Sequence, residues 1–170
     1  MNNLKVLHLL IKDELDKLRA LDKEKDGLLQ EKPSNYILRA GGSILHDFYT
    51  GIEKIFENVA KEIDRRLPVG EEWHSELLHQ MTLDIPGLRP PVISTHTEKK
   101  LREYLGFRHL FRKRYGFELD WEKMKRLLLK MAPVLSPLET EIEAFFQAIN
   151  GVLKGPKNDP AKGRVKGSRG

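Results

Sequence analysis

Cysteine is absent from the 170-residue chain, so neither a disulfide framework nor a cysteine-ligated metal site is available. This absence fits a reducing compartment such as the cytoplasm. Long apolar runs are absent too, because no stretch reaches the roughly 18 apolar residues that a membrane-spanning helix needs. The first residues, MNNLKVLHLLIKDELD, lack the basic start and the small-residue cleavage site of a signal peptide. We therefore expect a cytoplasmic protein that neither spans a membrane nor is exported.

Surplus charge is missing from most of the chain, although the net charge is +5 and the isoelectric point is near 9.3. Residues 154–170 carry six Lys or Arg and one Asp, whereas residues 1–153 carry 24 charges of each sign. The basic tail has Val165 as its only sizeable apolar residue, so it cannot bury enough surface to offset its ordering entropy. We expect a disordered tail that either aids solubility or contacts RNA or another polyanion without sequence specificity.

Strand patterns are also lacking, because no alternating β-branched run lies between turn signals. Apolar residues instead recur with the 3.6-residue period of helices in almost every segment. The predicted fold is all-α: one domain over residues 1–153, folded as an antiparallel bundle of five or six helices. The helices are expected to begin or end near Gly27, Ser34, Pro68, Glu71, Met81, Thr95, Gly116, Asp120, Ser136 and Gly151, with a proline-rich loop over residues 82–93.

Local signals predict the caps and the core of these helices. Ser34 and Asp120 are placed as N-caps, and residues 95–98 and 136–139 both have the pattern of a capping box. A bend is expected between Pro133 and Pro137. The Gly41-Gly42 pair predicts either a kink or the close approach of another helix. The buried stripe of the second helix is expected to contain Tyr36, Ile37, Ile44, Leu45, Phe48, Ile52, Ile55, Phe56, Val59 and Ile63.

Several catalytic patterns are absent as well. The chain has no phosphate-binding glycine loop, no nucleophile elbow and no paired-aspartate transferase motif. His74 and His79 are five residues apart, a spacing that suits joint metal ligation poorly, although three nearby glutamates leave a zinc site as an alternative. We predict neither a metal nor a cofactor.

Cations are concentrated in the stretch FRHLFRKRYGFELDW, residues 107–121. If residues 98–115 form one helix, Arg108 and Tyr115 lie on the same side of it, two turns apart. One interpretation is a solvated helix end, where cations stabilise the helix dipole. The other is a phosphodiester site, because guanidinium groups offer bidentate hydrogen bonds to phosphate. In that case Arg108, Arg112 and Arg114 bind RNA phosphates.

The longer stretch YLGFRHLFRKRYGFELDW resembles the signature helix of the HepT-like toxins of the HEPN superfamily. The motif of that family is an arginine, four residues, a histidine, one residue and a tyrosine. The stretches LHDFYTGIEKIFENVA and EEWHSELLHQMT and the aromatic-rich final helix are similar to the same family, so the resemblance covers roughly residues 1–150. It implies a HEPN-type bundle, a homodimer with a metal-independent ribonuclease centre in the cleft between protomers, and an MNT-type nucleotidyltransferase antitoxin that adenylylates the tyrosine.

Carried over residue by residue, the resemblance implies that Arg108 holds the scissile phosphate and that Tyr115 is the modification acceptor. Lys113 stands at the position of the motif histidine. Imidazole has an ordinary pKa of about 6.5 and suits proton transfer, whereas a lysine near 10.4 is almost wholly protonated. Lys113 would need a pKa about three units lower to act as a base. A protonated Lys113 still binds phosphate and can stabilise developing negative charge.

Two histidines could replace the missing imidazole. His109 follows Arg102 with six residues between them, which satisfies the looser superfamily spacing of four to six, but on a face distinct from the Arg108 and Tyr115 pair. The simpler interpretation of His109 is a polar or dimer-interface residue. His74 is the second candidate, because the resemblance includes the Trp73 and His74 pair. A buried, hydrogen-bonded histidine that supports the packing of Trp73 is the simpler interpretation there.

These observations leave two functions open. The first is a HepT-like HEPN protein of a toxin–antitoxin system, with a metal-independent RNA endonuclease scaffold and a variant active site. The alternative is a helical module that binds RNA or a nucleotidyltransferase and has lost ribonuclease activity at Lys113. The variant Lys113→His discriminates between them, because it restores cleavage only if the base alone is missing.

Overall fold

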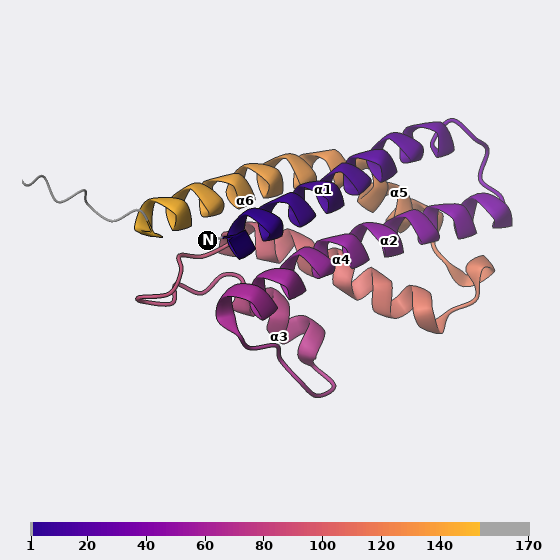
Figure 1. The fold of residues 1–170 in the computed structure, drawn as a ribbon. Helices are drawn as coiled ribbons and strands as arrows, with labels where there is room; N and C mark the ends of the chain where they lie inside the picture. Colours follow the sequence, from indigo (N-terminus) through magenta and orange to yellow (C-terminus); the bar gives the residue numbers. More distant parts are fainter. Residues whose placement is uncertain (1, 154–170) are drawn as a thin grey trace, which may run out of the picture.

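A computed structural model describes residues 2–153, and over this range the chain folds into helices and loops without a β-strand. The α-helices are α1 (Asn2–Leu28), α2 (Asn35–Val59), α3 (Trp73–Gln80), α4 (Thr95–Lys113), α5 (Trp121–Leu129) and α6 (Met131–Leu153). A π-helical turn, η1 (Ala60–Asp64), continues α2, and a 3₁₀ turn, η2 (Gly116–Glu118), precedes α5. Figure 1 shows the long helices side by side in one bundle, which confirms the predicted all-α fold. The predicted disorder of the tail concerns residues outside this range.

The core forms around α2, which contacts α1, α3, α4 and α5. Its buried side chains include Phe48, Ile52 and Phe56, and the predicted face of α1 packs against them through residues such as Leu7 and Ile11. Tyr36 was expected in this core, but that prediction is wrong because Tyr36 is 84% exposed. It lies in the first turn of α2, where the helix reaches the end of the bundle (Figure 1). Within the described residues, no helix is both long and apolar enough to cross a bilayer.

The helix starts agree only in part with the predicted caps. Ser34 Oγ accepts a hydrogen bond from the backbone N–H of Ile37, and the Asp120 carboxylate caps α5 as predicted. The cap of α4 is Ser94 rather than Thr95, because Ser94 is the extended residue whose hydroxyl accepts from Thr97 N–H. The predicted helix start at Ser136 is also wrong, since α6 begins at Met131 and runs through Pro137.

Tertiary packing explains why α6 begins early. Its residues Met131, Val134, Leu135 and Leu138 are all buried. This burial keeps the segment helical even though Pro137 removes one backbone hydrogen bond. The sequence signals of Pro137 were those of a helix start, and the packing of the first turn outweighs them.

The two adjacent glycines of α2 mark close helix contacts rather than a break, since α2 is continuous from Asn35 to Val59. A Cβ atom added to Gly42 would overlap with Cε2 of Phe111 in α4 and would lie 3.2 Å from Cδ1 of Leu119. A Cβ atom on Gly41 would lie 2.7 Å from Cε of Met124 in α5. Of the two predicted alternatives, close approach is therefore the one that the structure has.

We predict that Gly42→Ala destabilises the protein by about 1–3 kcal/mol, because the Phe111 ring is rigid and cannot yield without moving α4. The matched control is Gly27→Ala in α1, where an added Cβ meets nothing within 4 Å. That control should be neutral or stabilising by up to about 1 kcal/mol. Urea denaturation of both variants measures the difference. Equal stability of the two variants would contradict the close contact.

Candidate functional site

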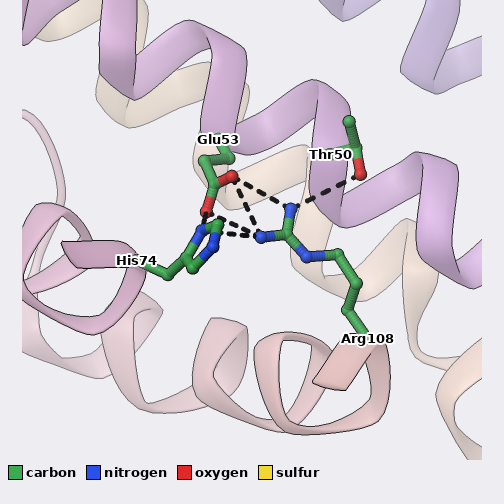
Figure 2. A network of polar contacts seen from close by, with 4 residues as sticks. All are labelled: Thr50, Glu53, His74 and Arg108. Atoms are coloured by element: carbon green, nitrogen blue, oxygen red, sulfur yellow. Dashed lines mark hydrogen bonds and ion pairs between the residues drawn. The ribbon is translucent and has the colours of Figure 1, made fainter. Parts of the chain in front are cut away.

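A buried ion pair joins α2 to α4 in the middle of the bundle. Arg108 of α4 is 3% exposed, and its Nη1 and Nη2 atoms both lie 3.0 Å from Oε1 of Glu53 in α2. Nη2 lies 3.1 Å from the second carboxylate oxygen, and Nη1 lies 3.4 Å from Oγ1 of Thr50. The guanidinium also lies over the ring of Tyr49, with Cζ 5.1 Å from the ring centroid. Figure 2 shows Arg108, Glu53 and Thr50 converging between the helices.

His74, the second residue of α3, completes this polar network. Its Nδ1 atom lies 2.7 Å from Oε2 of Glu53 and 2.7 Å from Nη2 of Arg108 (Figure 2). A protonated Nδ1 donates to Glu53, and an unprotonated Nδ1 accepts from Arg108, so one proton decides which of the two contacts is a hydrogen bond. The ring packs on Trp73, with 3.7 Å between the ring centroids. The short helix α3 is thereby fixed against both long helices.

His109 lies on the solvent side of this network. Its ring is exposed and meets the His74 ring edge-on, with centroids 5.7 Å apart. Partial desolvation lowers the pKa of His109 below its ordinary value, and the positive charges of Arg108 and Lys113 and the neighbouring His74 lower it further. The negative charge of Glu53 raises the pKa of His109, but by less than these groups lower it. The imidazole is therefore mostly neutral at pH 7 and able to accept a proton.

One exposed stripe of α4 carries His109 together with two cations. Arg102, Gly106, His109 and Lys113 follow the i, i+4, i+7, i+11 course of a single helix face, and all four are exposed. We call these four residues the α4 exposed face. Arg102 is held in place, because Nη1 donates to Oγ of Ser75 over 2.8 Å and Nη2 donates to Oε1 of Glu98 over 2.6 Å.

The structure separates residues that the sequence was expected to bring together. Helix α4 ends at Lys113, and the extended backbone of Arg114 leads Tyr115 out of the helix. Arg108 points into the core, whereas Tyr115 is 69% exposed beyond the helix end. The prediction that Arg108 and Tyr115 share one side of a helix is therefore wrong. The prediction failed because α4 ends at Lys113, before Tyr115. Beyond the helix end, Gly116 packs closely against the side chain of Arg39.

The remaining predicted residues divide into two groups. Trp73, His74 and His109 are brought together around Arg108, as the ring contacts show. Arg112, Lys113 and Arg114 are exposed, as a phosphate surface requires. The Arg108 guanidinium is engaged with Glu53, so it can reach a phosphate only if that pair opens. Among the described residues, no group of three His, Asp or Glu side chains gathers as metal ligands.

Sequence reasoning missed the partners that α2 supplies, chiefly Glu53 and Thr50. Glu53 occupies a position in line with the buried Leu45, Tyr49 and Phe56, at spacings of four and three residues. A carboxylate within an apolar stripe signals a buried partner, since an unpaired buried charge is costly. That signal could have identified Glu53, although nothing in the spacing identifies Arg108 as its partner.

Comparison with known proteins gives one match. The model of the family described as "HepT-like protein" matches residues 40–149, which is more than half of the chain. The matched range begins in the second turn of α2 and ends four residues before the end of α6, and so contains Glu53, His74 and all of α4. No curated protein and no solved structure gave a significant match.

We predict that removing one partner of the buried pair is far more damaging than removing both. Glu53→Leu leaves Arg108 buried without its carboxylate and should cost about 3–5 kcal/mol of unfolding free energy, as should Arg108→Met. The double variant Glu53→Leu/Arg108→Met should be more stable than either single variant. Urea denaturation tests this order. Additive losses in the double variant would show that the two groups are not coupled.

A second prediction concerns the protonation of His109. Its ring C–H signals in NMR spectra should titrate with a midpoint below the ordinary 6.5, because its protonated form is disfavoured. Lys113→Gln removes one of the positive charges responsible and should raise the midpoint. Lys5→Gln, the same charge change on α1, should leave it unchanged. A wild-type midpoint at or above 6.5 would contradict the electrostatic environment described for this ring.

Proposed function

Because the chain belongs to the HepT-like family, we propose that it is the toxin-side HEPN protein of a toxin–antitoxin system and acts on RNA as a metal-independent endonuclease. The observation that carries the proposal is the α4 exposed face, where a neutral imidazole lies between two cations. Single-stranded RNA offers this face its phosphates and its 2′-hydroxyl groups. A homodimer and a partner nucleotidyltransferase are part of the same proposal.

His109 takes the role of the general base in this proposal. Its neutral imidazole removes the proton from an RNA 2′-hydroxyl, whose oxygen attacks the neighbouring phosphorus to form a 2′,3′-cyclic phosphate. The bond from phosphorus to the 5′ oxygen breaks, and that oxygen takes up a proton from water while the imidazolium returns its proton to solvent. Lys113 lies one turn further along α4, so its ammonium is the nearest cation of this face to the phosphate under attack. It stabilises the negative charge that develops on the phosphoryl oxygens.

Arg102 binds a flanking phosphate rather than the scissile one. It lies seven residues before His109, which corresponds to about 10 Å along the helix axis. Its hydrogen bonds to Ser75 and Glu98 fix the guanidinium at the end of the face that is nearest α3. Arg112 and Arg114 add phosphate contacts at the other end of α4.

Arg108 acts as a positioning residue in this scheme. Its guanidinium orients Glu53 and His74, and the His74 ring supports the edge of His109. Tyr115, which lies beyond the end of α4 and is 69% exposed, is accessible to a nucleotidyltransferase. We propose it as the acceptor of adenylylation. A bulky nucleotide there would stand close to Arg112, Lys113 and Arg114 in sequence and would compete with RNA for them.

The non-catalytic alternative is favoured by two specific observations. The arginine at the family position is buried and paired with Glu53, and the histidine position holds Lys113. If the burial of Arg108 and the presence of Lys113 at the histidine position abolish proton transfer, the same surface would bind RNA without cleaving it. The two functions therefore share a binding surface and differ only in the chemistry at His109.

We predict that purified protein cleaves labelled single-stranded RNA in the presence of EDTA. His109→Ala should lower the cleavage rate by about 10²–10⁴-fold while RNA binding is retained, because only the proton transfer is lost. Arg102→Ala should mainly weaken binding. The wild-type rate should fall towards acid pH with a midpoint below the ordinary 6.5 of histidine, since the lowered pKa of His109 keeps its imidazole neutral to lower pH.

Two outcomes decide between the alternatives. Full activity of His109→Ala would exclude His109 as the base. Absence of cleavage by the wild type, with undiminished RNA binding and activity gained in Lys113→His, would establish the non-catalytic module. The matched control is His96→Ala, which removes another exposed histidine from the first turn of α4 and should change neither the cleavage rate nor RNA binding.

A further inference from the structure

A second concave site lies beside the α4 exposed face. Its volume is about 720 Å³, within the range of roughly 300–1,000 Å³ that is usual for ligand pockets. It is lined by the segment after η1, by α3, by the loop over residues 82–93 and by Arg102 of α4. Its apolar walls come from Leu67, Val69, Leu83 and Leu88, three of which are substantially exposed. Figure 1 shows α3 with a loop on either side of it along the chain, at the end of the bundle where α2 ends.

The pocket walls are held by buried polar contacts rather than left loose. The Arg89 side chain is fully buried and binds Asp64 through Nε and Nη2, and its Nη1 donates to the backbone carbonyl of Leu83 over 2.9 Å. Gln80 Nε2 donates to Asp64 Oδ2 over 2.7 Å and to the carbonyl of Arg66 over 3.2 Å. These bonds tie the loop, α3 and the end of η1 together, so the pocket is formed in advance of any ligand.

The backbone next to this pocket is unusual. The π-helical turn η1 ends α2, and Arg65 follows it with φ 54°, a left-handed conformation that residues other than glycine adopt rarely. Both features recur at functional sites. They turn the chain sharply so that Leu67 and Val69 reach the pocket opposite α3.

The polar groups of the pocket define the ligand it suits. Glu72 and Glu76 are exposed carboxylates at its lining, and neither has a partner among the described contacts. Carboxylates repel phosphates but accept hydrogen bonds from exocyclic amino groups such as N4 of cytosine. Apolar walls suit the faces of a planar ring, and Arg102 adds a cation on the side of the α4 exposed face.

We propose that this pocket binds one base of the RNA that lies along α4, and that it favours a base with an exocyclic amino group, cytosine above uracil. This inference rests on the proposed function, because it assigns the flanking phosphate to Arg102, which belongs to both sites. The RNA phosphates contact the cations of α4 while the base turns into the pocket. There its exocyclic amino group donates hydrogen bonds to the carboxylates of Glu72 and Glu76. The site thereby gives the endonuclease a base preference next to the scissile bond.

The pocket is tested first with mononucleotides, independently of cleavage. Cytidine 5′-monophosphate added to the ¹⁵N-labelled protein should shift the NMR signals of pocket residues such as His79 and Ser75, with an affinity at least about fivefold higher than that of uridine 5′-monophosphate. Leu83→Trp fills the pocket and should abolish these shifts. Leu10→Trp, which adds the same bulk at an exposed position of α1, should leave them unchanged. Equal affinities for the two nucleotides, or no shift at the pocket, would overturn the inference.

A second arm distinguishes RNA from a free nucleotide and separates the two proposals. Oligocytidylate should bind more tightly than the mononucleotide, and Lys113→Gln should weaken only the oligomer, since Lys113 is outside the pocket. If Lys113→Gln leaves oligomer binding unchanged, the base in the pocket does not come from RNA along α4 and the inference fails. Cleavage without any base preference would overturn only the proposal that the pocket binds a base. Base-selective binding without cleavage would support the pocket and contradict only the endonuclease.

Discussion

The buried ion pair between Glu53 and Arg108 is the constraint on which the arrangement of this molecule depends. A charge that far from water is tolerated only with a partner, so α2 and α4 must meet in one register. His74 lies against the same two groups and adds α3 to that register. Such a pair contributes little net stability compared with apolar packing, but it penalises every arrangement in which one charge is left alone.

The inward direction of Arg108 decides which residues of α4 face solvent. Because an α-helix has 3.6 residues per turn, residues on the side away from Arg108 face solvent, and Arg102, Gly106, His109 and Lys113 are among them. An arginine that a short motif would assign to phosphate is thus used for structure. Partial desolvation lowers the pKa of the His109 imidazole, and His74, Arg108 and Lys113, which lies one turn beyond His109, lower it further. The same register therefore sets both the geometry and the protonation of the candidate site.

Local patterns predicted the helices because apolar periodicity is a property of each segment by itself. The same patterns failed where distant segments decide the outcome. Packing of Met131 and Val134 extends α6 past the start that Pro137 signals, and the contact of Gly116 with Arg39 accompanies the early end of α4. The sequence identified Arg108, His109 and His74 as candidates but not their arrangement, since the pairing of Glu53 with Arg108 spans 55 residues. The pocket was not predicted at all, because the loop and helix ends that line it have no common motif.

Charge distribution explains how a domain without net charge could still orient RNA. Residues 1–153 carry equal numbers of acidic and basic side chains, so attraction to a polyanion must come from their placement rather than their sum. Cations gather towards the end of α4, at Arg112, Lys113 and Arg114, whereas Glu72 and Glu76 line the neighbouring pocket. Arg66 and Arg102 also line this pocket, so the repulsion that RNA phosphates would meet there is confined to the side of Glu72 and Glu76. A strand with its bases on the α4 cations would lose the attraction between those cations and its phosphates. Under the proposed function, the placement with the RNA backbone along α4 and a base beside Glu72 and Glu76 avoids this repulsion and keeps the attraction of the α4 cations, so the surface would bind RNA in one direction.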